Sequence, residues 1–213
     1  MQLPLFEGPD EEEVLGPGAV LLRGFARGEE ARLVRAMREV IAASPLRHMI
    51  TPGGFRMSVA MTNCGALGWV SDRRGYRYNA IDPESGRPWP AMPEAFSALA
   101  RRAAAQAGFE VFEPDACLIN RYEPGARLTL HQDKNERDFS QPIVSVSLGL
   151  PAVFLFGGDA RGDEQRRLPL AHGDVAVWGG PARLRYHGVL PLRDGEHPSL
   201  GRYRFNLTFR RAG

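Results

Sequence analysis

The chain has 213 residues, of which 43% are hydrophobic and 24% charged, as is usual for a globular domain. A domain of this length buries roughly 70% of the surface that its unfolded chain exposes, so it folds without disulfides or a structural metal. A net charge of +2 excludes a histone-like polycation. No run approaches the roughly 20 apolar residues of a membrane-spanning helix, and the start MQLPLFEGPDEEE is acidic, unlike a signal peptide. We expect a cytoplasmic protein without a membrane partner.

Arginine dominates the basic residues, since Lys134 is the only lysine among 27 Lys and Arg residues. The planar guanidinium group suits bidentate contact with carboxylates and phosphates, so a nucleic acid or a diacid is a permitted partner. A general compositional bias toward arginine explains most of these residues equally well. The two cysteines, Cys64 and Cys117, lack the spacing of a zinc or redox motif.

The first half of the chain predicts a mobile arm followed by two helices. Residues 1–18 are acidic and rich in Gly and Pro, so we expect an arm, with a single folded domain over residues 19–213. Apolar residues at three- and four-residue steps predict an amphipathic helix over residues 28–44. A second helix is expected after Pro93 and should end at Gly108. The predicted buried faces of the two helices consist of Leu33, Val34, Met37, Val40 and Ile41, and of Phe96, Leu99, Ala100 and Ala103.

Residues 51–93, between the helices, are rich in glycine and aromatic residues and predict mainly loops. From residue 116 to the end, seven short alternating segments are separated by Pro, Gly, Asp or Asn. Strands at this spacing favour an antiparallel sandwich or jelly roll. The predicted strands are ACLINRY, RLTLHQD, IVSVSLG, AVFLF, DVAVW, RLRYHGV and RYRFNLTFR.

A candidate metal site begins in the segment RLTLHQD. Residues two apart share one face of a strand, so Thr129, His131 and Asp133 should point the same way. An HxD pair is common by chance and needs a third ligand. His187 lies in a later strand that could run beside the first, and two histidines with one carboxylate form the facial triad of non-haem Fe(II) oxygenases. His172 is the rival third ligand, although its HGD context is typical of a turn.

The last segment, RYRFNLTFR, alternates between an aromatic and a polar face. Arg204 and Arg210 are six residues apart, roughly 20 Å between Cα atoms, and side chains reaching inward would leave about 7 Å between their guanidinium groups. This gap suits a short dicarboxylate, although a solvated arginine face is the simpler explanation. The polar face consists of Arg202, Arg204, Asn206, Thr208 and Arg210, and Asn120 and Tyr122 in ACLINRY offer neutral hydrogen bonds to the same ligand.

Taken together, these motifs resemble those of the bacterial AlkB family of Fe(II)- and 2-oxoglutarate-dependent nucleic-acid repair dioxygenases. The resemblance extends over nearly the whole chain. It includes TPGGFRMSVAMTNCG, LGW, PWPAMP, PDACLINRYEPGA, HQDK, PIVSVSLGLPA, FGG, HGDVAVWGG, RYHG and NLTFR. It implies a mainly β fold with flanking helices: a double-stranded β-helix, or jelly roll, with its core at residues 116–213 and a nucleotide-recognition lid at residues 51–93.

The resemblance also implies roles for individual residues. His131, Asp133 and His187 would bind Fe(II), Arg204 would pair with the distal carboxylate of 2-oxoglutarate, and Arg210 would act on the metal side. Asn120, Tyr122, Asn206 and Thr208 would complete the cosubstrate pocket. The nucleotide-binding positions would be Trp69, Tyr76, Tyr78 and Arg161. Stacking on Trp69 suits an N-methylated base, which is cationic, and His131 would close its other face.

Asn135 departs from the family pattern, which has HQDKD where this chain has HQDKN. The family's aspartate would lie near the exocyclic amine of the damaged base. An amide still forms hydrogen bonds but loses the attraction to a positive charge. We therefore expect the substrate range and the rate to differ here, while the iron chemistry does not.

The implied reaction is oxidative demethylation of 1-methyladenine and 3-methylcytosine in DNA, and by extension RNA, with Fe(II) as cofactor and 2-oxoglutarate and O2 as cosubstrates. Succinate, CO2 and formaldehyde would be released, and a base in a duplex would have to be flipped out. We expect a monomer that needs no protein partner. Two alternatives remain at this stage: an oxygenase that acts on RNA or on a protein side chain, and a catalytically silent nucleic-acid-binding module.

Overall fold

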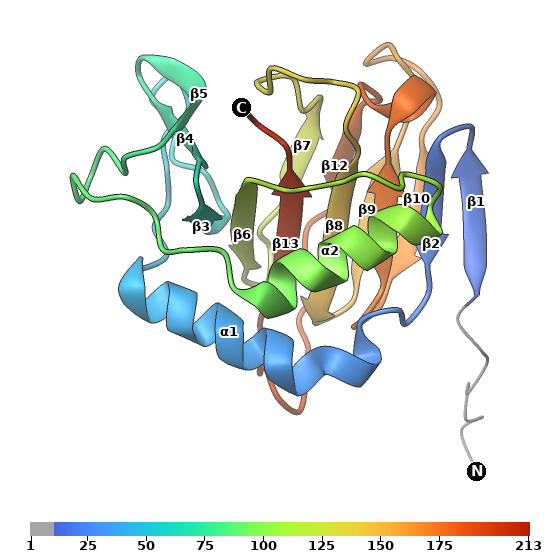
Figure 1. Ribbon diagram of the computed structural model, residues 1–213, viewed down its shortest axis with the longest axis horizontal. Helices are drawn as coiled ribbons and strands as arrows, with labels where there is room; N and C mark the ends of the chain where they lie inside the picture. The colour runs from blue at the N-terminus through green and yellow to red at the C-terminus, as the bar shows by residue number, and fades with distance from the viewer. Residues whose placement is uncertain (1–10) are drawn as a thin grey trace.

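The computed structural model describes residues 11–213, so residues 1–10 of the predicted arm lie outside the described residues. Two antiparallel sheets face each other, and two helices lie across the outer face of the larger sheet (Figure 1). The larger sheet has seven strands in the order β1 (Glu12–Gly16), β2 (Ala19–Leu22), β11 (Val175–Trp178), β8 (Ile143–Gly149), β13 (Arg204–Arg210), β6 (Ala116–Tyr122) and β3 (Ala60–Gly65). This arrangement is the predicted jelly-roll sandwich.

The smaller sheet has four strands, and a two-stranded hairpin stands apart from both sheets. The smaller sheet has the order β10 (Arg166–Leu170), β9 (Ala152–Phe156), β12 (His187–Val189) and β7 (Leu128–His131). The hairpin consists of β4 (Gly68–Asp72) and β5 (Gly75–Asn79), and it lies at the end of the larger sheet opposite β1 (Figure 1). Within residues 11–213, no helix has the length and apolar composition needed to cross a membrane.

Both predicted helices are confirmed. They are α1 (Glu30–Ala43), preceded by the short 3-10 helix η1 (Arg27–Glu29), and α2 (Glu94–Gln106). The predicted apolar faces are buried except for Ile41, which is partly buried. Gly108 ends α2 as expected, because it adopts a positive φ of 85° and lets the Phe109 N–H bond back to the Ala104 carbonyl.

Two hydrophobic cores lie on either side of the larger sheet. Under the helices, the core contains the aromatic face of β13, which includes Phe205, Leu207 and Phe209. The second core fills the sandwich and includes Phe154, Phe156 and Trp178. Because strand residues alternate between faces, the polar residues of β13 point into the sandwich rather than into solvent. Arg204, Asn206, Thr208 and Arg210 are all buried there.

The prediction that folded structure begins near Ala19 is wrong within the described residues. Glu12–Gly16 form β1, which pairs antiparallel with β2 at the edge of the larger sheet. Pro17 and Gly18 make the turn of this hairpin rather than a linker. Gly18 has a φ of 75°, and a Cβ there would lie 2.4 Å from the Gly179 carbonyl oxygen, so only glycine fits this close approach.

Three further details differ from the predicted strands. The lid region contains β3, which belongs to the larger sheet. β10 was not predicted because Pro169 interrupts the strand pattern, and it is tolerated because β10 is an edge strand. The predicted strand RLRYHGV is a strand only over His187–Val189, after the short 3-10 helix η2 (Gly180–Ala182).

Candidate active site

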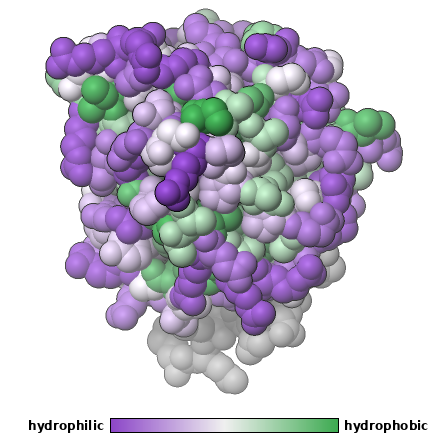
Figure 2. Space-filling model, turned by 60° about the vertical axis from the view of Figure 1, so that its left-hand side comes forward, coloured by the Kyte–Doolittle hydropathy of each residue, from purple (hydrophilic) through white to green (hydrophobic). Residues whose placement is uncertain are grey.

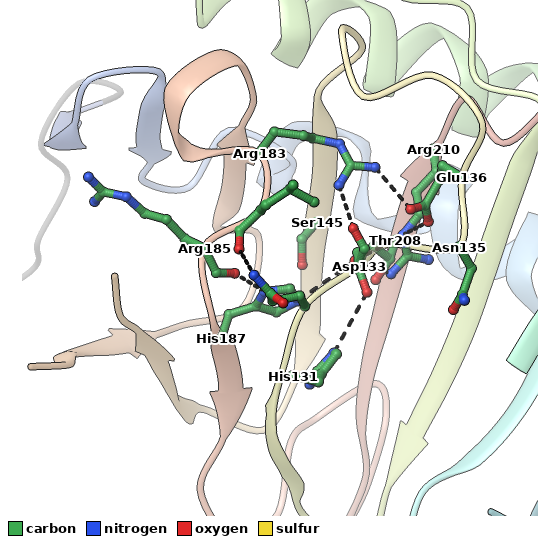
Figure 3. A network of polar contacts seen from close by, with 12 residues as sticks. His131, Asp133, Asn135, Glu136, Ser145, Arg183, Arg185, His187, Thr208 and Arg210 are labelled. Atoms are coloured by element: carbon green, nitrogen blue, oxygen red, sulfur yellow. Dashed lines mark hydrogen bonds and ion pairs between the residues drawn. The ribbon is translucent and has the colours of Figure 1, made fainter. Parts of the chain in front are cut away.

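The three predicted metal ligands converge inside the mouth of the sandwich (Figure 3). His131 is the last residue of β7 and His187 the first of β12, and these two residues pair directly in the antiparallel register. Asp133 follows β7 by two residues, in the loop that leads to β8. One potential ligand atom from each side chain lies within 4.8 Å of the others. The Nε2 atoms of both histidines are 3.7 Å from a carboxylate oxygen of Asp133.

The backbone fixes which nitrogen each histidine presents to a metal. His131 Nδ1 is 2.8 Å from the Thr129 carbonyl oxygen, and His187 Nδ1 is 3.0 Å from that of Arg185. A carbonyl only accepts, so both Nδ1 atoms carry the proton and both Nε2 lone pairs face Asp133. Burial, together with His131 nearby, lowers the pKa of His187 to about 4, so this imidazole is neutral at physiological pH.

Arg210 keeps Asp133 ionised. Its Nε and Nη2 atoms donate to Asp133 Oδ2 at 3.0 and 2.5 Å. Burial alone would raise the pKa of Asp133, but the Arg210 guanidinium group holds that pKa well below its usual range. One carboxylate and two imidazoles that present Nε2 form a donor set that fits Fe(II) and leaves coordination positions open.

His172, the rival third ligand, lies in another cluster. It is grouped with Glu30 and His197 beside the N-terminal end of α1. The Gly149 N–H donates to His172 Nδ1 at 2.9 Å, so Nε2 carries the proton and points toward Glu30 at 3.4 Å. This tautomer has no free lone pair directed at Glu30, and the cluster therefore suits a histidine–carboxylate contact better than a metal.

Arg204 is a buried cation with unused donors. Its residue is 1% exposed, and its guanidinium group lies 4.8 Å from the centre of the Tyr122 ring. Nη2 donates to Ser147 Oγ at 3.1 Å, whereas Nε and Nη1 have no hydrogen-bond partner among the described residues. Buried donors are normally paired, and a charged group left unpaired is costly. The unpaired N–H groups therefore fit an anionic ligand such as a carboxylate of 2-oxoglutarate.

The other predicted cosubstrate residues line the same interior. In the register of β13 with β6, Arg204 is opposite Tyr122 and Asn206 is opposite Asn120. Asn206 and Thr208 bond to each other and to the sheet, since Thr208 Oγ1 donates to Asn206 Oδ1 at 2.7 Å. Asn120 Oδ1 has no partner among the described residues and is open to a ligand's donor. Arg210 is engaged with Asp133, and Arg202 lies outside β13 and pairs with Asp194 on the surface.

The predicted base-contacting residues adjoin the metal ligands through Asn135. Trp69 on β4 and Tyr76 on β5 stack with a centroid distance of 5.6 Å and an interplanar angle of 13°. Trp69 Nε1 donates to Asn135 Oδ1 at 3.2 Å. Tyr76 is 44% exposed, and Phe55 on the neighbouring loop is 76% exposed. Figure 2, which turns the hairpin side forward, shows a mainly hydrophilic surface with scattered apolar residues.

Tyr78 contacts the interior of the site, whereas Arg161 lies on the surface. The Tyr78 hydroxyl donates to Glu136 Oε1 at 2.6 Å, and burial raises the pKa of Tyr78 well above its usual value. Tyr78 thus anchors the hairpin to the site. Arg161 is exposed on the connection between β9 and β10, with its guanidinium group 5.2 Å from the centre of the Tyr186 ring.

Two buried residues of the site were missed by the sequence reasoning. Glu136 and Arg183 are 6% and 3% exposed, and their carboxylate and guanidinium groups are 3.1 Å apart. Glu136 lies in a loop outside every predicted strand, whereas Arg183 begins the predicted strand RLRYHGV but follows η2 and precedes β12 in the structure. The only signal for Glu136 was its place beside Asn135, and Arg183 is one of 26 arginines.

Comparisons with known proteins agree with this geometry. Residues 18–210 match the family model described as the 2OG-Fe(II) oxygenase superfamily. The chain is 59% identical to the alpha-ketoglutarate-dependent dioxygenase AlkB of Escherichia coli strain K12, over 95% of this chain and 94% of that protein. It is 48% identical to an AlkB homolog of Caulobacter vibrioides, over 84% and 81% of the two chains. The solved structure of OsALKBH1 superimposes with a TM-score of 0.81 at 29% identity, covering 94% of this chain and 99% of that one.

Proposed function

The chain belongs to the 2OG-Fe(II) oxygenase superfamily, and from this premise we propose that it oxidatively demethylates N-alkylated bases such as 1-methyladenine and 3-methylcytosine in DNA. It is an Fe(II)- and 2-oxoglutarate-dependent dioxygenase. The observation that carries the proposal is one sandwich interior that holds both the His131, Asp133 and His187 cluster and two donor atoms of Arg204 that have no partner among the described residues. The stacked aromatic rings of the hairpin adjoin this interior through Asn135.

Each residue of the interior has a role in the proposed reaction. When bound, Fe(II) and 2-oxoglutarate let O2 hydroxylate the N-methyl group, with succinate and CO2 as products, and the hydroxymethyl group then leaves as formaldehyde. His131, Asp133 and His187 hold the metal, and Arg210 keeps Asp133 ionised and oriented. Arg204 binds the distal carboxylate of 2-oxoglutarate, while Asn120 and Tyr122 line the pocket.

The hairpin selects the base. An N-alkylated adenine or cytosine is cationic, and the electron-rich face of Trp69 attracts it. A base that is unpaired or flipped out of a duplex enters between Trp69 and His131, which is 37% exposed at its side chain. Asn135, Tyr76, Tyr78 and Arg161 complete the nucleotide contacts. We expect the preference among bases to depend on Asn135, and RNA to be a further substrate.

Variants of the ligand residues test the site. We expect His131→Ala, Asp133→Ala and His187→Ala each to abolish succinate formation, because two remaining ligands hold the metal too weakly and out of alignment. His172→Ala is the matched control and should keep its activity. Loss of iron binding in His172→Ala but not in His187→Ala would move the site to the Glu30 cluster.

The alternatives are separated by a competition assay. A methylated oligodeoxynucleotide, its RNA counterpart and a peptide are offered together, and succinate release is assigned to the substrate consumed. We expect the DNA oligonucleotide to be demethylated first. Turnover of the peptide alone would contradict the proposed substrate class, and absence of 2-oxoglutarate consumption with Fe(II) present would support a silent binding module. The monomeric state and the cytoplasmic location stay predictions.

A further inference from the structure

The loop between β7 and β8, residues 132–142, has to place two residues of the site accurately. It carries Asp133 toward the metal ligands and Asn135 toward the hairpin, yet it contains no helix or strand. Loops without regular structure are more mobile than the elements that they connect. Metal sites, in contrast, need their ligands held in alignment by surrounding contacts. Something outside the loop must therefore hold it.

Arg183 contacts this loop at four places, and Figure 3 shows its contacts with Asp133 and Glu136. Its Nη1 donates to the Asp133 carbonyl oxygen at 2.8 Å, and its Nε donates to the Gln141 carbonyl oxygen at 3.0 Å. Nη2 lies 3.1 Å from Glu136 Oε2. The guanidinium carbon is 5.3 Å from the centre of the Phe139 ring. A single side chain, 3% exposed, thus contacts the loop from Asp133 near its start to Gln141 near its end.

The backbone of Arg183 is itself fixed, and it leads to another ligand. Its N–H donates to the Gly180 carbonyl at 3.1 Å, and the preceding Ala182 is fully buried. His187 follows only four residues later, at the start of β12. Arg183 therefore connects the segment that presents His187 to the loop that presents Asp133.

The contacts continue from Arg183 into the hairpin. One carboxylate oxygen of Glu136 forms an ion pair with Arg183, and the other accepts a hydrogen bond from the Tyr78 hydroxyl at 2.6 Å. Arg210 Nε also lies 3.4 Å from that second oxygen while it bonds to Asp133. Each charged group of this buried chain has an oppositely charged neighbour within 3.4 Å, which favours one geometry over alternatives, although Glu136 Oε2 forms no hydrogen bond among the described residues.

We propose that Arg183 is a positioning residue for the metal site, acting through the main chain of Asp133 and through Glu136. Its recorded contacts are with the Asp133 and Gln141 carbonyl oxygens, the Glu136 carboxylate and the Phe139 ring, and none is with a ligand side chain. The inference rests on the proposed function only in taking His131, Asp133 and His187 as metal ligands. Its effect should fall on metal affinity and kcat, and little on the binding of 2-oxoglutarate.

The test is Mn(II) binding to the full chain without nucleic acid, with Mn(II) as a redox-stable probe for Fe(II). Arg183→Met removes all five donors but keeps an unbranched chain. We expect it to lower Mn(II) affinity about tenfold, within the range found when contacts behind metal ligands are lost. Arg183→Lys should give an intermediate loss, because one ammonium group cannot serve two carbonyls and a carboxylate at once.

Arg47→Met is the matched control. Arg47 also pairs with a buried carboxylate, that of Asp82, and also lies over an aromatic ring, that of Trp89 at 5.4 Å, but it makes no contact with the β7–β8 loop. We expect a comparable loss of stability and a change in Mn(II) affinity below twofold. In Arg183→Met at saturating metal, kcat should fall about tenfold while the KM for 2-oxoglutarate changes less than threefold.

Wild-type Mn(II) affinity in folded Arg183→Met would overturn the proposal, and so would an equal loss of affinity in Arg47→Met. If Arg183→Met does not fold, Arg183→Lys decides, and wild-type affinity there would overturn the proposal as well. Because the binding measurement involves no substrate and no turnover, its outcome is independent of whether the proposed base is the true one.

Discussion

Arg204 shows how one buried side chain can define its ligand. It is a permanent cation at 1% exposure, two of its donor atoms have no partner within residues 11–213, and burial lowers its pKa although Tyr122 opposes this effect. A guanidinium group in this state is stabilised only when an anion enters the pocket. The polar face of the last strand suggested only a short dicarboxylate between Arg204 and Arg210, with a solvated face as the simpler explanation, and the family resemblance assigned the distal carboxylate to Arg204. Arg210 instead pairs with Asp133.

Replacing Arg204 should therefore weaken cosubstrate binding specifically. We expect Arg204→Ala to raise the KM for 2-oxoglutarate at least tenfold, because a charge-assisted bidentate contact is lost and a carboxylate stays unpaired. The affinity for methylated DNA should barely change. Arg202→Ala is the control, since Arg202 pairs with Asp194 on the surface. An unchanged KM in Arg204→Ala, measured by steady-state succinate release, would refute the carboxylate contact.

A substitution at Asn135 should change the preference among bases in a defined direction. Its Oδ1 accepts the Trp69 N–H at 3.2 Å, a bond that an aspartate at the same place would keep. Asn135→Asp adds a negative charge beside a base that is cationic when alkylated at N1 of adenine. We expect several-fold higher activity on 1-methyladenine, a gain of about 1 kcal/mol, and a smaller gain on neutral 1-methylguanine.

The two lesions should be compared in the same oligonucleotide at matched iron and 2-oxoglutarate. A selective gain on the cationic lesion supports charge sensing at residue 135. Equal changes on both lesions, or lower activity on 1-methyladenine, would show that Asn135 does not sense the charge of the base.

At the scale of elements, the β4–β5 hairpin is fastened to the larger sheet by Asn63. This fully buried residue of β3 donates from Nδ2 to the Trp69 carbonyl at 2.9 Å and accepts the Trp69 N–H at 3.0 Å. The amide thus holds the backbone of the residue proposed to stack on the base. Its orientation determines where the hairpin stands relative to the metal ligands.

Asn63→Ala should loosen this attachment. We expect the KM for a methylated oligonucleotide to rise several-fold and stability to fall by about 2 kcal/mol, because two backbone groups lose their partners. The KM for 2-oxoglutarate should stay within twofold. Thr62→Val is the control variant, since Thr62 is also buried in β3 but its hydroxyl donates to the Ser44 carbonyl oxygen next to α1. If both variants weaken oligonucleotide binding equally, the attachment has no special role.

The elements also explain which predictions succeeded. Both helices and the ligand-bearing β7 follow regular periodicities, and these could be predicted. β1 could not, because its acidic residues and the Pro17–Gly18 turn looked like a linker until they paired with β2. The contacts of Arg183 with the β7–β8 loop could not be predicted either, because they join residues about 50 positions apart and the predicted strand RLRYHGV does not reveal what its first residue contacts.

At the scale of the molecule, ion pairs bind the loop after the hairpin to the rest of the fold. Asp82 is 3% exposed, and its carboxylate oxygens accept from Arg47 at 2.9 and 2.5 Å. Burial would raise the pKa of Asp82, but the bonds from Arg47 and from the backbone of Glu84 outweigh it and lower the pKa to about 2. The carboxylate therefore stabilises the fold above pH 4 and ceases to do so as pH falls toward 2.

Asp82→Asn should remove this pH dependence. The shift from an ordinary aspartate corresponds to about 2 kcal/mol at neutral pH. We expect the difference in unfolding free energy between wild type and Asp82→Asn to shrink by about that amount between pH 5 and pH 2, as measured by urea unfolding. The exposed Asp159 provides the control variant Asp159→Asn. A difference that stays constant with pH would show that the ion pair is not coupled to folding.

The most direct test of the whole account is formaldehyde release from a single-stranded oligodeoxynucleotide that contains one 1-methyladenine. With Fe(II), 2-oxoglutarate and O2, the wild-type protein should release one formaldehyde for each adenine restored, with succinate formed in the same assay, and His187→Ala should release none. Formation of succinate without restored adenine, or formaldehyde release that persists in His187→Ala, would contradict the account.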